Sequence, residues 1–232
     1  MKRHIPNIIT CLNVTCGALA ILTATEFDNL FYASLFILAG MVFDFFDGLT
    51  ARALNVKSEV GKELDSLADV CSFGVAPAIL AYKMMGDVAP VGMEWLAYSA
   101  FVIPAFSAYR LAKFNLDTRQ TVSFIGMPTP ANALFWVGLV LGSYWAPEVY
   151  NAVFANIYVL AFFAVAFALL LISELPMFSL KLQGFGWNQN KELYIFMIVT
   201  ATLLAIIGTG VVMALMPLYV LVCFVSFVIG RK

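Results

Sequence analysis

Charged residues are scarce in this chain of 232 amino acids, and the scarcity excludes most soluble folds. Only 12% of the residues are charged and 62% are hydrophobic, whereas about a quarter of the residues in an ordinary soluble domain are charged. The formal net charge is -1, so the chain has neither a basic surface for nucleic acid nor an acidic tail. The composition therefore predicts an integral membrane protein that contacts membrane lipid and binds no nucleic acid.

Cysteine is also scarce, and its spacing excludes two further classes of protein. The four cysteines stand singly in apolar segments, with no CxxC pair: Cys11, Cys16, Cys71 and Cys223. A structural zinc site or a secreted disulfide framework needs cysteines at short or regular spacings. We expect neither, and we interpret the cysteines as small buried apolar residues.

Long apolar stretches, in contrast, fill most of the chain. A helix needs roughly 20 apolar residues to cross the hydrocarbon core of a bilayer. Stretches of about this length are separated by short polar or Gly/Pro breaks and fall at residues 8–25, 30–54, 61–84, 94–116, 129–146, 150–173, 191–209 and 211–230. We predict an all-α fold, a polytopic membrane bundle of about eight transmembrane helices that forms a single domain over residues 1–232.

The distribution of lysine and arginine predicts the orientation of these helices. With a cytoplasmic N-terminus and eight spans, every basic residue except Lys83 falls on the cytoplasmic side, as the positive-inside rule requires. Acidic residues gather in the opposite loops instead. We therefore expect both termini in the cytoplasm, in a protein of the cell (inner) membrane.

One acidic segment interrupts the apolar pattern. The segment "DFFDGLTARALNVKSEVGKELDSLAD" covers residues 44–69. Asp44 and Asp47 are three residues apart on one predicted helix, and Asp65 and Asp69 are four apart on the next, so each pair shares a helical face. A turn at residues 54–60 would bring the two faces together in a hairpin at the cytoplasmic side.

Four carboxylates at membrane depth need a positive partner. A single charged aspartate at the centre of a span costs about 2.5 to 3.5 kcal/mol on insertion scales. Arg52 alone offsets little of this charge. Hard oxygen ligands in a carboxylate cluster suit Mg²⁺, Mn²⁺ or Ca²⁺. The cluster therefore predicts one or two divalent metal ions.

The residues between the aspartate pairs predict a phosphate ligand. Gly48 and Ala51 leave the helix face beside Asp47 bare, which lets a bulky group approach the backbone. The planar guanidinium of Arg52 can bind phosphate oxygens, and Mg²⁺ commonly binds through carboxylates and substrate phosphates together. We infer a metal-assisted diphosphate site that opens to the cytoplasm.

The segment also resembles a known signature. It matches the CDP-alcohol phosphotransferase pattern D-x2-D-G-x2-A-R-x8-G-x3-D-x3-D at every fixed position. The segment "IPNIITCLN" at residues 5–13 is similar to the family's entry into its first helix. "YRLAKFN" at 109–115 and "FIGMPTPANA" at 124–133 are similar to the phosphatidylserine synthase branch. The resemblance covers roughly the first 135 residues, and helices in the region 150–230 match only in being hydrophobic.

The resemblance implies a transferase that moves a phosphatidyl group from CDP-diacylglycerol to an alcohol, serine in this branch, and releases CMP. It implies two divalent metal ions, Mg²⁺ or Mn²⁺ with Ca²⁺ possible, and a homodimer. Asp69 would also be the general base. The implied metal ligands are Asp44, Asp47, Asp65 and Asp69, and the implied CDP-diacylglycerol contacts are Asn7, Thr10, Gly48, Ala51, Arg52, Ser58 and Gly61.

The acceptor site is predicted from the chemistry of serine, whose carboxylate needs a cation and whose ammonium needs a hydrogen-bond acceptor. Arg110 and Lys113 can supply the first, and Asn115 or Asp117 the second. The alternative for the two cations is that they anchor the helix end at lipid headgroups.

Two alternative functions stay open at this point. The first is the same transfer to glycerol 3-phosphate or an inositol phosphate, which would require a larger basic cluster beside the aspartates. The second is a cation transporter, which would require acidic residues at mid-depth in several helices. In the later helices the acidic residues stand only at the predicted span ends, which argues against transport.

Overall fold

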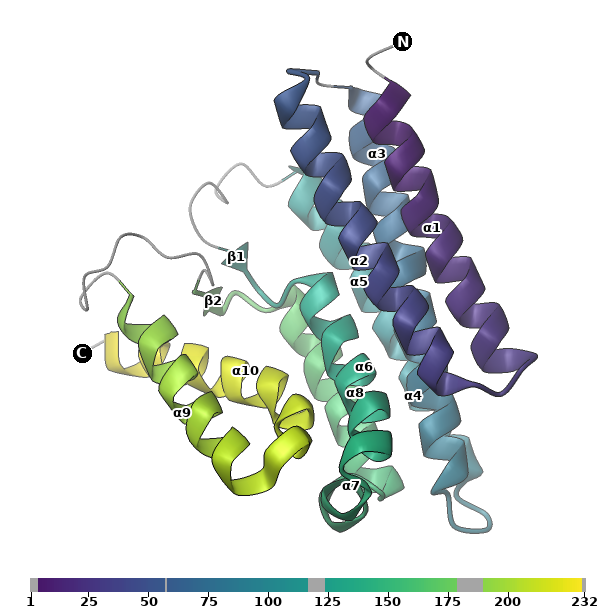
Figure 1. Cartoon of the computed structure of the whole chain (residues 1–232), viewed down its shortest axis with the longest axis vertical. Coiled ribbons are helices and arrows are strands. Elements are labelled where there is room, and N and C mark those ends of the chain that lie inside the picture. Colours follow the sequence, from purple (N-terminus) through teal and green to yellow (C-terminus); the bar gives the residue numbers. More distant parts are fainter. Residues whose placement is uncertain (1–3, 57, 117–123, 179–189, 231–232) are drawn as a thin grey trace.

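The computed structural model describes residues 4–56, 58–116, 124–178 and 190–230, and these are almost entirely helical (Figure 1). The predominantly helical fold is therefore confirmed. The elements in chain order are α1 (His4–Thr25), α2 (Leu30–Ala53), α3 (Glu59–Asp69), η1 (Val70–Val75), α4 (Ala76–Asp87), η2 (Glu94–Phe101), α5 (Val102–Leu116), β1 (Phe124–Ile125), α6 (Thr129–Trp145), α7 (Pro147–Val153), α8 (Ile157–Ile172), β2 (Pro176–Met177), α9 (Lys191–Ile207), η4 (Gly208–Gly210) and α10 (Val211–Gly230).

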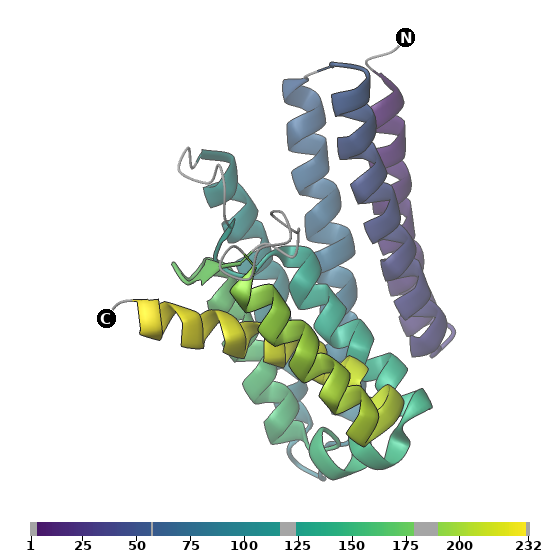
Figure 2. The ribbon, with the colours of Figure 1, turned by 60° about the vertical axis from the view of Figure 1, so that its left-hand side comes forward.

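The first two helices form a long antiparallel pair, side by side over most of their length (Figures 1 and 2). The side chain of Asn29 accepts a hydrogen bond from the backbone N–H of Tyr32 and so caps the start of α2. At the other end of α2 the chain turns back, with Asn55 at a positive φ of 50°. Ser58 then caps α3 by accepting from the N–H of Gly61. The predicted hairpin is confirmed.

The third span is continuous from α3 to α4 but changes its helical type in the middle. The segment η1 is a π-helix, in which the N–H of Ala76 donates to the carbonyl of Cys71, five residues back. At the far end of this span Lys83 forms an ion pair of 2.7 Å with Asp28, in the turn between α1 and α2. The predicted break near residue 86 is thus at the same end of the bundle as the α1–α2 turn.

Some predicted boundaries were wrong. The span expected at 150–173 is two helices, α7 and α8, bent by 83°. Pro147 begins α7, and Asn156 caps α8 by accepting from the N–H of Tyr158, so the bend lies at residues 154–156. Two short antiparallel strands, β1 and β2, also pair between the helices. Of the cysteines, Cys11 is exposed and Cys71 is only partly buried.

The described residues contain four segments long and apolar enough to cross a membrane, or five if α7 and α8 form one span. The four are His4–Thr25, Leu30–Ala53, Glu59–Asp87 and Lys191–Ile229. The last of these folds back as a hairpin of α9 and α10 (Figure 1), where Gly208 adopts a φ of 55°. A membrane protein with several spans is confirmed, while the number eight and the orientation of the termini stay predictions.

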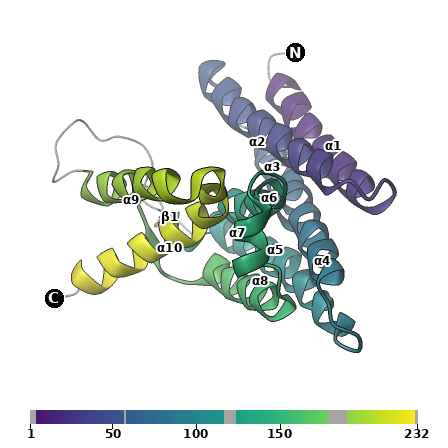
Figure 3. The same cartoon turned by 60° about the horizontal axis from the view of Figure 1, so that its bottom comes forward.

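The centre of the molecule is α6, which carries the most continuous run of buried residues. Phe135 packs against Phe163 and Phe167 of α8 with ring centroids 4.9 and 4.6 Å apart. Figure 3 shows α1 and α2 on one side of the bundle and the α9–α10 hairpin on the other, with α6 between them. The aspartates of α2 and α3 therefore lie in the N-terminal part of the bundle, to one side of this central packing.

Candidate active site at the α2–α3 hairpin

The structure brings the predicted carboxylates together. Asp44 and Asp47 on α2 and Asp65 on α3 each offer one ligand oxygen, and these oxygens lie within 4.8 Å of one another. Asp47 is 7% exposed, and the other two are partly buried. The spacing of three and four residues on two facing helices thus produces one cluster, as the sequence predicts.

Asp69 lies one helical turn beyond Asp65. It is not among the three carboxylates that share the 4.8 Å cluster, but its side chain interacts electrostatically with Asp44. Only 9% of Asp69 is exposed, and its Oδ1 is buried without a hydrogen-bond partner in the described part of the chain. Asp69 therefore stands at the inner edge of the cluster, away from bulk water.

The cluster fits a divalent metal. Two carboxylates about 4.8 Å apart repel by roughly 3 to 4 kcal/mol at an effective dielectric constant of about 20, and three such pairs cannot all stay ionised without a cation or shared protons. The orphaned Oδ1 of Asp69 provides a further free oxygen. All of these donors are hard carboxylate oxygens, the ligands that Mg²⁺ and Mn²⁺ prefer.

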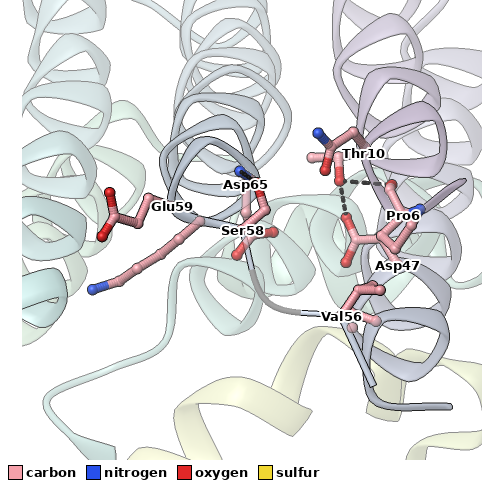
Figure 4. A pocket seen from close by; sticks show the side chains of 12 residues that line it. Pro6, Thr10, Asp47, Val56, Ser58, Glu59 and Asp65 are labelled. Atoms are coloured by element: carbon pink, nitrogen blue, oxygen red, sulfur yellow. Dashed lines mark hydrogen bonds between the residues drawn. The ribbon is translucent and has the colours of Figure 1, made fainter. Parts of the chain in front are cut away.

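The first helix completes this side of the site. The hydroxyl of Thr10, which is 3% exposed, lies 2.6 Å from Asp47 Oδ2 and 3.1 Å from the carbonyl of Pro6 (Figure 4). A hydrogen bond to a charged group contributes about 1.5 to 3 kcal/mol, so Thr10 orients Asp47 toward the cluster.

A cavity of about 650 Å³ opens beside the aspartates. Figure 4 shows Thr10, Asp47 and Asp65 facing the space between α1, α2 and α3. The lining residues are Pro6, Asn7, Thr10, Asp47, Gly48, Ala51, Val56, Ser58, Glu59, Gly61, Lys62 and Asp65. The structure therefore gathers around one cavity all but one of the residues expected to contact CDP-diacylglycerol.

The exception is Arg52. Its side chain is exposed in the last turn of α2 and is not among the residues that line the cavity. Its neighbour Ala51 does line the cavity, so Arg52 lies at the edge of the cavity. Its contact with a phosphate stays a prediction.

Sequence reasoning missed four residues of the cavity: Pro6, Val56, Glu59 and Lys62. Lys62 could have been found, because it stands three residues before Asp65 and so shares its helical face. Its ammonium donates to the carbonyl of Asn115 at 2.8 Å. Pro6 and Val56 carry no chemical signal, and only the packing of the turn against α1 brings them to the cavity.

The predicted acceptor residues lie on α5, on the inner side of the cluster. Arg110 is 7% exposed, its Nε has no hydrogen-bond partner among the described residues, and it interacts electrostatically with Asp69. Its guanidinium also lies 5.7 Å from the ring centroid of Phe114. A buried cation beside Asp69 is not a headgroup anchor, and the anchor interpretation does not fit Arg110.

The other acceptor candidates have protein partners. Lys113 lies 3.9 Å from Glu174, and the Nδ2 of Asn115 donates to the hydroxyl of Ser66 at 2.9 Å. Lys113 lines a small crevice with Arg110 and Ser173. Asp117 lies outside the described residues. Among these candidates, Arg110 is therefore the one with a buried donor, Nε, that has no hydrogen-bond partner among the described residues.

Gly48 supports a testable prediction about the cavity. No atom lies within 4 Å of a Cβ built at this position, so a leucine there would project into the cavity and leave the helix packing intact. We expect Gly48→Leu to raise the KM for the lipid donor about tenfold or more, since it fills space that the ligand needs. Kinetics at varied donor concentration measure this. Gly86→Leu, also in open space but far from the cavity, is the matched control, and an unchanged KM in Gly48→Leu would contradict the assignment of the cavity.

Comparison with known families agrees with this geometry. The family model described as CDP-alcohol phosphatidyltransferase matches residues 3–172. The chain belongs to this family. The match runs from the start of α1 to the end of α8 and so contains the aspartate cluster, the cavity and Arg110.

Individual members of the family are also similar to the chain. A protein of Bacillus subtilis (strain 168) is 44% identical over 129 residues, which cover 55% of this chain and 70% of that protein. A protein of Helicobacter pylori (strain ATCC 700392 / 26695) is 40% identical over 139 residues, 59% of this chain and 56% of its own length. A protein of Methanocaldococcus jannaschii is 32% identical over 204 residues, 88% of this chain and 84% of its own. All three are named CDP-diacylglycerol–serine O-phosphatidyltransferase.

Proposed function

We propose that this protein is a CDP-diacylglycerol–serine O-phosphatidyltransferase. It transfers the phosphatidyl group of CDP-diacylglycerol to the hydroxyl of L-serine and yields phosphatidylserine and CMP, a step of phospholipid biosynthesis. The observation that carries the proposal is the cluster of Asp44, Asp47 and Asp65, with the buried Asp69 one turn beyond it, beside the 650 Å³ cavity. Family membership and the names of the three relatives support it.

The donor binds in the cavity between α1, α2 and α3. Asn7 and Ser58 offer polar side chains at its wall beside Gly61, and the bare backbone at Gly48 admits the bulky nucleotide. Two divalent ions, Mg²⁺ or Mn²⁺, would be held by Asp44, Asp47, Asp65 and Asp69. When bound, they supply positive charge that neutralises the diphosphate and stabilises the leaving CMP.

Asp69 is the general base. It takes the proton of the serine hydroxyl, whose oxygen forms a bond to the phosphorus that carries diacylglycerol. The bond between that phosphorus and the bridging oxygen breaks, and CMP leaves with the electron pair. The position of Asp69 favours this role, because it stands at the inner edge of the cluster, away from bulk water and beside the buried Arg110.

Arg110 binds the carboxylate of serine. It is the buried cation beside Asp69, and its Nε is free to donate. Lys113 and Asn115 stand at the same helix end and complete the acceptor site from its rim. A phosphorylated acceptor would need several cations at this position, and among the described residues Arg110 is the one buried arginine or lysine.

The proposal also includes the placement of the protein. The site opens to the cytoplasm from the inner membrane, as the distribution of basic residues indicates, and the active form is a homodimer, as the family resemblance implies. A cation transporter is the weaker alternative, because Asp47 and Asp65 line a cavity of about 650 Å³, a volume typical of small-molecule sites.

A panel of alcohols tests the acceptor. Purified protein in detergent micelles is given CDP-diacylglycerol, Mg²⁺ and either L-serine, glycerol 3-phosphate, inositol phosphate or glycerol, and CMP release is measured. We expect CMP and phosphatidylserine in equal amounts with serine, at a rate at least tenfold above that with the other alcohols. Faster release with glycerol 3-phosphate than with serine would contradict the serine assignment. Protein carrying Asp47→Asn serves as the control for release by contaminating enzymes.

A further inference from the structure

The π-helix η1 follows directly after Asp69 and is held between two neighbouring helices. On one side the hydroxyl of Ser72, which is fully buried, donates to the carbonyl of Asn13 on α1 at 2.9 Å. On the other side Gly74 lies against Ser107 of α5, so closely that a Cβ at Gly74 would be 3.1 Å from the Cβ of Ser107. Short helical segments with π geometry occur frequently at functional sites.

The contact with α1 leaves no free space. A Cβ added at Gly17 would lie 2.5 Å from the Oγ of Ser72 and 2.8 Å from its Cα. The hydroxyl could rotate away, but the backbone of η1 cannot give way without a shift of the whole segment. Glycine at position 17 therefore sets how closely η1 approaches α1.

This contact lies one helical turn from the reacting groups. Ser72 follows Asp69 by three residues at the start of the π-helix, so its contact with α1 lies within one turn of Asp69 along the span. Asp69 interacts electrostatically with Asp44 on α2, the partner helix of α1. On α5, Ser107 precedes Arg110 by three residues. The contact of η1 with α1 therefore lies within a turn of Asp69, and its contact with α5 lies within a turn of Arg110.

We propose that Ser72 and Gly17 are positioning residues, which hold η1 against α1 so that Asp69 reaches Asp44 on one side and Arg110 on the other. The inference rests on the proposed function for the role of Asp69, and it adds residues outside the signature segment 44–69 to the machinery of the reaction. A displacement of about 1 Å at a reacting group can lower a rate by about 100-fold.

Two variants and one matched control test this proposal. We expect Gly17→Ala to lower kcat for CMP release at saturating Mn²⁺ by about 10- to 100-fold. The KM for CDP-diacylglycerol should change less than about threefold, because the cavity residues on α1, Pro6, Asn7 and Thr10, all precede Gly17 by at least seven residues. Ser72→Ala keeps the space but loses the hydrogen bond, and about a threefold fall in kcat is expected. Gly86→Ala is the control, since no atom lies within 4 Å of its Cβ.

Binding of Mn²⁺, followed by the loss of the free-ion signal in electron paramagnetic resonance, gives a readout that is independent of turnover. We expect Gly17→Ala to weaken Mn²⁺ binding about tenfold relative to Gly86→Ala. Unchanged kcat and unchanged Mn²⁺ binding in Gly17→Ala and Ser72→Ala would overturn the proposal. If Gly17→Ala does not fold, Ser72→Ala decides alone, by a fall in kcat at an unchanged melting temperature or by none.

Failure of the proposed function can be distinguished from failure of the positioning role of Gly17 and Ser72. If the wild-type protein binds Mn²⁺ but releases no CMP with any alcohol, the proposed function fails. The positioning role of Gly17 is then still decided by the difference in Mn²⁺ binding between Gly17→Ala and Gly86→Ala.

Discussion

Replacing Asp69 by asparagine is expected to lower the rate of phosphatidylserine formation by roughly 1,000-fold. Asparagine keeps the size of the side chain, but it cannot take the proton of the serine hydroxyl, and general-base catalysis contributes about 10²- to 10⁴-fold. Because the cavity is lined by other residues, the KM for CDP-diacylglycerol should change much less than kcat. Steady-state kinetics with purified protein measure both.

The control for this variant lies on the same continuous span. Asp87→Asn makes the same chemical change at the exposed far end of α4, and we expect wild-type kinetics from it. A rate in Asp69→Asn within tenfold of the wild type, in protein with an unchanged melting temperature, would remove Asp69 from the role of base. A fall in rate that saturating Mn²⁺ restores would show that Asp69 is a ligand alone.

Removal of divalent metal is expected to abolish the transfer. Three carboxylate oxygens within 4.8 Å of one another already repel, and the diphosphate of the donor would bring further negative charge to the same place. Metal ions supply several kcal/mol of charge stabilisation in such reactions, and each 1.36 kcal/mol corresponds to a factor of ten in rate. Treatment with EDTA should therefore lower CMP release by at least about 100-fold.

Two additions to the chelated protein make this prediction specific. Excess Mg²⁺ or Mn²⁺ should restore the rate, and the same addition to Asp47→Asn protein should restore little, because one ligand of the cluster is lost. Full activity in the presence of EDTA would mean that the aspartates carry another function. Failure of both Mg²⁺ and Mn²⁺ to restore activity, with Ca²⁺ succeeding, would change the identity of the metal and keep the site.

Most helix boundaries could be predicted from the sequence, because they depend on neighbouring residues. Apolar length predicted the spans at 30–54 and 211–230 to within one residue. Residues that cap helices, such as Ser58, and the turn after α2 likewise act locally. The bend between α7 and α8 was missed, because α7 ends at Val153 and Asn156 caps the start of α8 inside an apolar stretch, and hydropathy does not register that break.

The candidate site likewise contains residues that local spacing predicts and residues that only tertiary packing brings to the cavity. Helical spacing was sufficient to predict that Asp44, Asp47 and Asp65 would converge, since the three- and four-residue intervals and one short turn determine their faces. Lys62 was missed although its spacing from Asp65 would have revealed it. Pro6 and Val56 could not have been found, since they reach the cavity through packing between α1 and the turn.

Composition and helical spacing were sufficient to predict the class of the protein and the convergence of Asp44, Asp47 and Asp65, because these follow from residues at most a few helical turns apart. The tertiary structure was needed to reveal the shape of the cavity, the position of Arg52 outside its lining and the burial of Arg110. It also decided the contact between Gly17 and Ser72 around the π-helix. These features depend on how closely helices far apart in the chain approach one another, and close packing of particular side chains is not encoded in any local pattern.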